Sequence, residues 1–330
     1  MNTTTMKWLL RREFWENKGS MFWAPAVVGA LLVLLIGGTI VYGVAAHGVP
    51  AHVTINGHTI ADGRMAASVT VESRQMIARM ASGMYLGAAS PLFFMLSFAV
   101  FFYCLNSLYD ERRDRSILFW KSLPVSDQMT VLSKVLTAVL VAPLITIGLA
   151  VVASLALLLL VCVAFGLQGI NMIGPVLASR DLYLSPLSLL ALVPVYAVWA
   201  LPTVAWLMLV SSWARTKPFM WAVGVPLVGL LILKWIDAAM EQMSGSSLAI
   251  MPYAQDVAAR ILGGIMPGIW FVFKGGVPAG LHPRAEGMDL PGLVSGSYAS
   301  LADADAWIGV AAAAVMLFGA MRLRRYRDEG

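Results

Sequence analysis

Long apolar runs alternate with short polar segments along most of the chain. A helix that spans a bilayer needs about 20 mostly apolar residues. Runs of this length predict transmembrane helices over Phe22–Ala46, Met84–Leu108, Val131–Phe165, Leu187–Trp213, Phe219–Met240 and Ala306–Leu323. The third run is long enough to tilt, or to project beyond the bilayer.

The segment between the first two runs is long and carries a period-two pattern of apolar residues. Over Val53–Ile60 the apolar positions alternate around Asn56 and Gly57. An Asn-Gly pair between alternating residues is typical of a two-residue hairpin turn. The segment is therefore predicted to contain a small β-hairpin.

The segment before the last run, residues 241–305, holds a shorter apolar stretch at Ile261–Phe273. Apolar stretches of about 10–14 residues are too short to span and are often re-entrant or interfacial. Glycine and proline interrupt this one near its middle, at Gly263, Gly264, Pro267 and Gly268. Because these residues break helices, we expect a helix–turn–helix that dips into the outer leaflet. The alternative is a helix lying on the membrane surface.

The composition supports the same class of protein. The chain is 59% hydrophobic and 12% charged, whereas soluble domains average about 25% charged residues. Too few polar residues remain to cover a surface in water. We therefore expect an all-α integral membrane protein, with residues 1–330 forming a single transmembrane domain. The net charge of +5 does not indicate nucleic-acid binding, because the basic residues flank apolar runs rather than one polar face.

The distribution of Lys and Arg predicts the orientation. Most of the 23 basic residues lie near the two chain ends, in residues 110–134 and in residues 215–217. Short loops rich in Lys and Arg stay in the cytosol, so both termini are expected there. The first apolar run is also longer than the core of a cleaved signal peptide, which indicates a retained helix.

The first cytosolic segment, residues 110–127, has an unusual order of residues. A charged start is followed by four apolar residues, Ile117–Trp120, in a loop that should face water. Pro124 disfavours a helix just before it, and Ser126 or Asp127 can cap the helix that follows. We expect a short helix across the cytosolic ends of the bundle. Its aromatic face requires either lipid headgroups or another protein as a partner.

This segment resembles the permease subunits of ABC-2 type transporters. In that family a Glu-Arg cluster and then a Leu-Pro-hydrophobic-Ser turn follow the second helix. The matching positions here are Glu111, Arg112, Ser116, Leu123, Pro124 and Ser126, while Arg115 stands where many members have Gly. The amphipathic segment 4–20 resembles the family's interfacial elbow helix. The broken apolar stretch before the last run resembles its outer re-entrant hairpin.

The resemblance implies an exporter in the bacterial cytoplasmic (inner) membrane. Two permeases, either identical or paralogous, would form the pathway. Each would bind a cytosolic ATP-binding cassette subunit that carries ATP and Mg. ATP-driven closure would push the loop after helix two and the loop between helices four and five. The expected docking residues are Glu111, Arg112, Arg113, Arg115, Ile117, Leu118, Phe119, Trp120, Lys121, Pro124, Arg215 and Lys217.

The chain itself lacks the sequence signals of catalysis. The dipeptide Gly-Lys of a phosphate-binding loop does not occur, so ATP is expected on the partner subunit. All four histidines fall in outer loops, without the cysteine or carboxylate spacing of a metal site. No cofactor, metal site or catalytic residue is therefore predicted on this chain.

A few polar residues within the apolar runs are candidates for lining a pathway. Lys234, Asp237 and Glu241 share one helical face at spacings i, i+3 and i+7. They would either line the route or pair with one another at the outer interface. Tyr103 and Asn106 would face the pore or a neighbouring helix. An alternative to the exporter is an ion-gradient-driven transporter, which would show inverted repeats and a charged midplane site; neither is evident.

Overall fold

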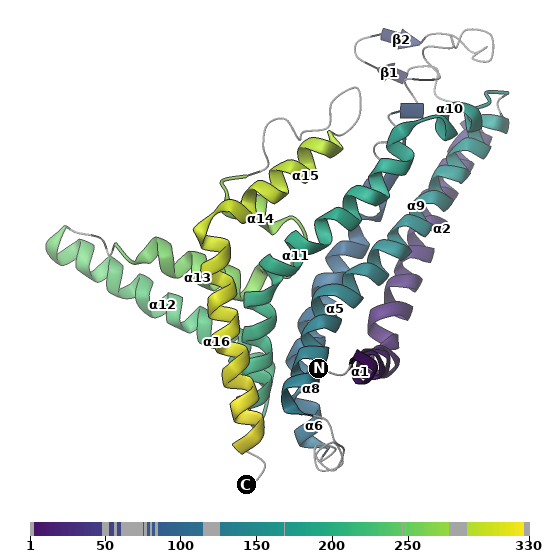
Figure 1. Ribbon diagram of the computed structural model, residues 1–330. Helices are drawn as coiled ribbons and strands as arrows, with labels where there is room; N and C mark the ends of the chain where they lie inside the picture. The colour runs from purple at the N-terminus through teal and green to yellow at the C-terminus, as the bar shows by residue number, and fades with distance from the viewer. Residues whose placement is uncertain are drawn as a thin grey trace.

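The computed structural model contains long helices and one small hairpin (Figure 1). It describes residues 3–47, 53–55, 58–60, 75, 78–79, 81–82, 85–114, 126–167, 169–245, 247, 249–276 and 289–326. Six stretches of helix within these residues are long and apolar enough to span a bilayer: Gly19–Gly43, Tyr85–Arg113, Asp127–Leu167, Arg180–Trp213, Pro218–Met243 and Ala304–Arg324. Each contains or overlaps one of the apolar runs predicted from the sequence.

The N-terminal half forms one side of the bundle. Helix α1 (Thr3–Glu16) is seen nearly end-on in Figure 1, whereas α2 (Ala24–His47) climbs away from it beside α9 (Ala142–Leu167). The second span consists of a 3₁₀ turn (Tyr85–Ala89), α5 (Ser90–Ser107) and the short α6 (Tyr109–Arg113). The third begins with α8 (Asp127–Leu136), where the Ser126 hydroxyl accepts a hydrogen bond from the Met129 N–H. The predicted cap is thus present.

Two π-helical turns interrupt these helices. Gly19–Trp23 joins α1 to α2, and Thr137–Val141 joins α8 to α9. In each, the N–H of the following residue bonds the carbonyl five positions back, Gly19 or Thr137. A proline follows each turn by two residues, at Pro25 and Pro143. Because proline has no N–H to donate, the regular hydrogen-bond ladder cannot pass through it, and the wider turn lies where the ladder is interrupted.

The C-terminal half is organised around α11 (Arg180–Trp213), which follows the short α10 (Ile173–Leu177). Helix α11 packs against α5, α9, α15 (Leu290–Ala299) and α16 (Ala304–Tyr326). Its buried face supplies Val195, Ala200, Val204 and Leu207 to the main apolar core. Small and β-branched residues on this face allow several helices to approach it closely.

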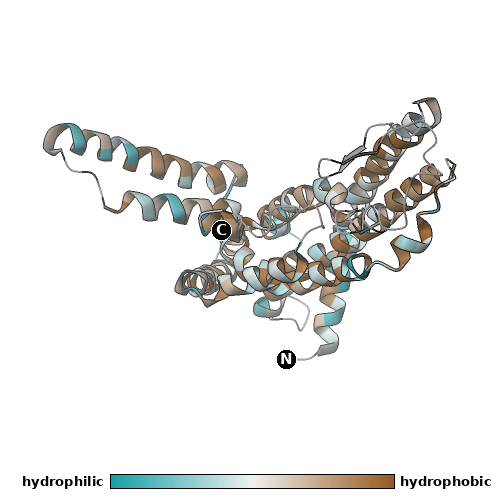
Figure 2. Cartoon of the chain, turned by 90° about the horizontal axis from the view of Figure 1, so that it is seen from above, coloured by the Kyte–Doolittle hydropathy of each residue, from teal (hydrophilic) through white to brown (hydrophobic). Residues whose placement is uncertain are grey.

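Helices α12 (Pro218–Ser244) and α13 (Met251–Gly263) contact each other and project to one side of the bundle in both views (Figures 1 and 2). Figure 2 shows apolar residues along much of this pair. The chain then turns at Gly264–Gly268 into α14 (Ile269–Phe273). The predicted helix–turn–helix is therefore present, although its first helix starts earlier than the apolar stretch. Whether it dips into the outer leaflet stays a prediction.

The predicted hairpin is also present. Strands β1 (Val53–Ile55) and β2 (His58–Ile60) pair antiparallel, with Val53 opposite Ile60 and Ile55 opposite His58. The hairpin lies at the end of α2 that is remote from α1 (Figure 1). Helix α1, α6 and the end of α16 lie at the opposite end, which we call the charged end. Both ends of the chain therefore lie on one side of the candidate spans.

Candidate functional site at the charged end

Four buried charged side chains from four helices meet at the charged end. Glu13 of α1, Glu111 of α6, Lys134 of α8 and Arg324 of α16 are all less than 10% exposed. The Lys134 Nζ lies 3.0 Å from Glu13 Oε1 and 3.1 Å from Glu111 Oε1. Two carboxylates therefore share one ammonium group, inside a region that water scarcely reaches.

The fourth member completes the charge balance. The Arg324 guanidinium lies 2.9 Å from Glu111 Oε2, and its Nε donates to Asp127 Oδ1 at 3.1 Å. Lys134 and Arg324 thus supply two positive charges against the two buried carboxylates. Burying an isolated charge is very costly unless it is paired, so the four residues depend on one another. The cluster ties α1, α6, α8 and α16 together.

Tyr103 is bonded to this cluster and also lines the cavity described below. It is 6% exposed, and its hydroxyl donates to Glu13 Oε2 at 2.8 Å. Asn106, one turn further along α5, is exposed and lines the cavity described below. Both residues line that cavity, but Tyr103 is buried and bonded to Glu13 whereas Asn106 is exposed.

Arg112 fixes the base of the following loop to the end of α11. Its Nη2 donates to the carbonyl oxygens of Ser211 at 2.5 Å and Ala214 at 2.9 Å. The Ser211 hydroxyl oxygen accepts from the N–H groups of Leu108 and Tyr109 at 3.1 and 2.9 Å. The guanidinium thus satisfies carbonyls that the helix end leaves without intrahelical partners. The two loops expected to dock an ATPase are joined here.

The expected docking residues fall into three groups. Glu111 and Arg112 make the contacts within the chain given above. Arg113, Arg215 and Lys217 are exposed near the same end. Arg115, Ile117, Leu118, Phe119, Trp120, Lys121 and Pro124 lie outside the described residues. Docking therefore stays a prediction, and the structure indicates that the first two residues anchor the loop.

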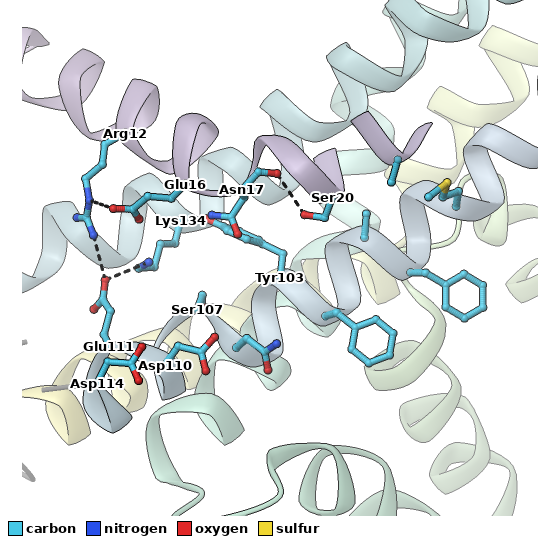
Figure 3. A pocket seen from close by; sticks show the side chains of 16 residues that line it. Arg12, Glu16, Asn17, Ser20, Tyr103, Ser107, Asp110, Glu111, Asp114 and Lys134 are labelled. Atoms are coloured by element: carbon cyan, nitrogen blue, oxygen red, sulfur yellow. Dashed lines mark hydrogen bonds and ion pairs between the residues drawn. The ribbon is translucent and has the colours of Figure 1, made fainter. Parts of the chain in front are cut away.

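A cavity of about 560 Å³ opens beside the cluster (Figure 3). It lies between α1, the first π turn and α5. The polar side chains of its wall come from α1, the π turn, the α5–α6 region and α8. Those labelled in Figure 3 include Arg12, Glu16, Asn17, Asp110, Asp114 and Lys134. The rest of the wall is apolar and comes mostly from α5, with Met95, Phe98, Ala99 and Phe102. One space thus joins a charged region to an apolar one.

The charged residues of α12 lie elsewhere. Lys234 and Glu241 are exposed and Asp237 is partly buried, on the helix pair that projects from the bundle. None of them lines the cavity. Their proposed place along a pathway stays a prediction.

Arg260 of α13 is a residue that the sequence interpretation missed. Its guanidinium lies over the rings of Trp199 and Phe273, at 5.3 and 5.4 Å from their centroids. It also donates to the Asp305 backbone oxygen at 2.9 Å and lies 3.2 Å from that carboxylate. Cation–π and ionic contacts together join the helix–turn–helix to α11 and to the start of α16.

The fold defines an integral membrane protein with six candidate spans. Among the described residues, no three His, Cys, Asp or Glu side chains are grouped so that they could hold a metal ion. Comparison with protein-family models, curated proteins and solved structures finds no match. The function is therefore inferred from the site and from the sequence motif.

Proposed function

We propose that the chain is the permease subunit of an ABC-2 type exporter in the bacterial cytoplasmic membrane. Both termini would lie in the cytosol, and a separate ATP-binding subunit would carry ATP and Mg. A second copy of the chain, or a paralogue, would complete the pathway. The support comes from six candidate spans and from the loop motif around Glu111 and Pro124.

The observation that carries the proposal is the anchoring of the loop base. Glu111 is joined through Lys134 and Arg324 to α1, α8 and α16, and Arg112 is joined to the end of α11. Movement of the loop that begins at residue 114 would therefore be passed to four helices through short polar contacts. A coupling element between an ATPase and a pathway requires this type of connection.

Helix α1 fits the role of an interfacial elbow. Trp8, Trp15 and the following Trp23 are 63%, 54% and 59% exposed, whereas Met6 and Leu9 are buried against the bundle. Tryptophan is enriched where membrane meets water. Arg11 lies over the Trp8 ring at 5.6 Å, which places a cation beside this aromatic surface.

An ion-gradient-driven transporter is less well supported by the same cluster. Such a protein needs a charged site near the membrane midplane that can be emptied and filled. The buried carboxylates of Glu13 and Glu111 lie at the charged end and are already neutralised by Lys134 and Arg324. They are better suited to a structural linkage than to ion exchange.

Co-purification tests the proposal. The chain is expressed together with a candidate ATP-binding cassette subunit, as the wild type and as Phe119→Asp/Trp120→Asp. We expect the double substitution to lose the partner, because two aromatic side chains of the predicted docking segment become charged. Tyr253→Asp is the control, since Tyr253 is a 70% exposed aromatic residue on α13, remote from the docking loops.

Retention of the ATPase by the double variant would contradict the docking assignment. Transport by the purified chain without any nucleotide-hydrolysing partner would contradict the exporter itself. Loss of the partner from the Tyr253→Asp control as well would show that the contact is not at the loop.

A further inference from the structure

The cavity beside the charged cluster combines two kinds of wall. Phe98 and Phe102 are 51% and 48% exposed and line its apolar part together with Met95 and Ala99 of α5. Asp110 and Asp114, one helical turn apart, line the polar part of the wall eight and twelve residues beyond Phe102; we call this polar part the mouth. A volume of about 560 Å³ is within the range of small-molecule sites, roughly 300–1,000 Å³.

The charge of the cavity is negative once internal pairs are taken into account. The Arg12 Nε lies 2.7 Å from Glu16 Oε1, and Lys134 is held between Glu13 and Glu111. Among the described residues, no ion pair is formed by Asp110 or Asp114. Arg113 and Lys134 are near enough to Asp110 to interact with it electrostatically. The described wall nevertheless holds four carboxylates against two cations, so it is net negative.

We propose that this cavity binds a lipophilic organic cation. The positive centre would lie beside Asp110 and Asp114, on the net negative part of the described wall. The apolar body would lie against Phe98 and Phe102, whose ring faces also attract cations. Both the apolar wall and the acidic mouth are needed for this ligand class. An anion of the same size would meet the same apolar wall but repulsion at the mouth.

The binding site goes beyond the proposed function and does not require it. Only the further statement that the cation is the exported substrate rests on the permease assignment. Binding and transport are therefore measured separately.

The binding test uses two probes of nearly equal shape and opposite charge, tetraphenylphosphonium and tetraphenylborate. The purified full chain is reconstituted in lipid nanodiscs, and empty nanodiscs give the background partition of each probe. We expect saturable binding of tetraphenylphosphonium only. Asp110→Asn/Asp114→Asn should weaken it about fivefold at low ionic strength, and less at high salt, because exposed charges are screened.

Two further variants separate the walls of the site. Phe98→Ala/Phe102→Ala should weaken binding of the cation at every salt concentration, because the loss is apolar contact. Asp256→Asn is the matched control, since Asp256 is an exposed carboxylate on α13; it should leave the affinity unchanged. Thermal unfolding of each variant checks that it is folded.

Equal affinity of the wild type and of Asp110→Asn/Asp114→Asn for the cation would overturn the proposal. Saturable binding of tetraphenylborate at the same site would do so too. If the cation binds as expected but an ATP-driven complex does not move it, the site stands, and its assignment as the substrate site fails. If transport is driven by ATP but the cavity variants do not alter binding, the exporter stands and this site fails.

Discussion

At the residue scale, Lys134 holds the cluster at the charged end together. It is 3% exposed and faces two carboxylates within about 3 Å. Removing one member of a buried ion pair is more destabilising than removing the whole pair, because the remaining charge stays buried without a partner. The cluster is therefore a sensitive point of the fold, irrespective of how much net stability it provides.

Lys134→Ala should lower the free energy of unfolding by about 3 kcal/mol, because Glu13 loses its cation and Glu111 keeps only arginine contacts. Thermal or denaturant unfolding of the purified chain measures this. Lys7→Ala is the control: Lys7 lies on the same end of the molecule but is exposed, and its loss should change little.

A second variant shows whether charge is the cause. Lys134→Met with Glu13→Gln removes opposite charges together and retains most of the side-chain volume. It should be more stable than Lys134→Met alone. If the double variant is instead less stable by the sum of the two single effects, the pair is not coupled and the interpretation is wrong.

The sequence contained a signal for this cluster. Glu13 falls on the same helical face as Met6 and Leu9, and Lys134 lies on the face of Val131 and Val135. Opposite charges on the apolar faces of two helices indicate a buried pair. The pairing of Glu13 with Lys134, 121 residues apart in sequence, results from the packing of α1 on α8. It could not be deduced from the local pattern alone.

At the scale of elements, the turn between α13 and α14 depends on close packing against α11. A Cβ added to Gly264 would lie 2.6 Å from the Trp199 carbonyl oxygen and 2.7 Å from Thr203 Oγ1. At Gly263 an added Cβ meets nothing within 4 Å. The absence of a side chain at Gly264 therefore permits the turn to lie close to α11, whereas Gly263 faces open space.

Gly264→Ala should destabilise the protein by about 2 kcal/mol, as expected for overpacking against a backbone atom. Gly263→Ala should be neutral or slightly stabilising, because alanine favours the helix at that position. The unfolding midpoints of the two variants are compared in the same detergent. Equal midpoints would mean that the turn is not packed against α11 as described.

The helices were predicted better than their ends. Length and hydropathy are sufficient for the six spans because lipid imposes both. Helix α11 begins at Arg180, earlier than predicted, because Arg180, Asp181 and Pro186 resemble a loop when they are read without their packing. Helix α15 was missed among glycines and serines, although Asp289 caps it at 3.0 Å and Pro291 follows, which is a recognisable start signal.

At the scale of the whole molecule, the two ends of the chain lie at one end of the bundle and the hairpin at the other. An even number of spans places both termini on the same side of a membrane, so this arrangement agrees with six candidate spans. The compartment to which that side belongs is an inference from Lys and Arg counts. It can be measured with introduced cysteines, because the native Cys104 and Cys162 are buried.

Positions 215 and 255 lie before and after α12, and both are exposed. The variants Arg215→Cys and Gln255→Cys therefore report on the two ends of this helix. In intact cells a membrane-impermeant maleimide should label the cysteine at 255 and should reach that at 215 only after permeabilisation. Lys7→Cys should behave like Arg215→Cys. Labelling of positions 215 and 255 from the same side would show that α12 does not cross the membrane.

The π turn at Thr137–Val141 lies within a 41-residue helical span. A π turn holds one residue more than an α-helical turn, so deleting one residue of Thr137–Val141 should restore a regular helix and leave Lys134 close to its present bearing. Each residue of a regular helix advances about 100° around the axis. A one-residue deletion in the regular part of α9 would therefore rotate Lys134 and its apolar neighbours away from the lipid-facing pattern that follows.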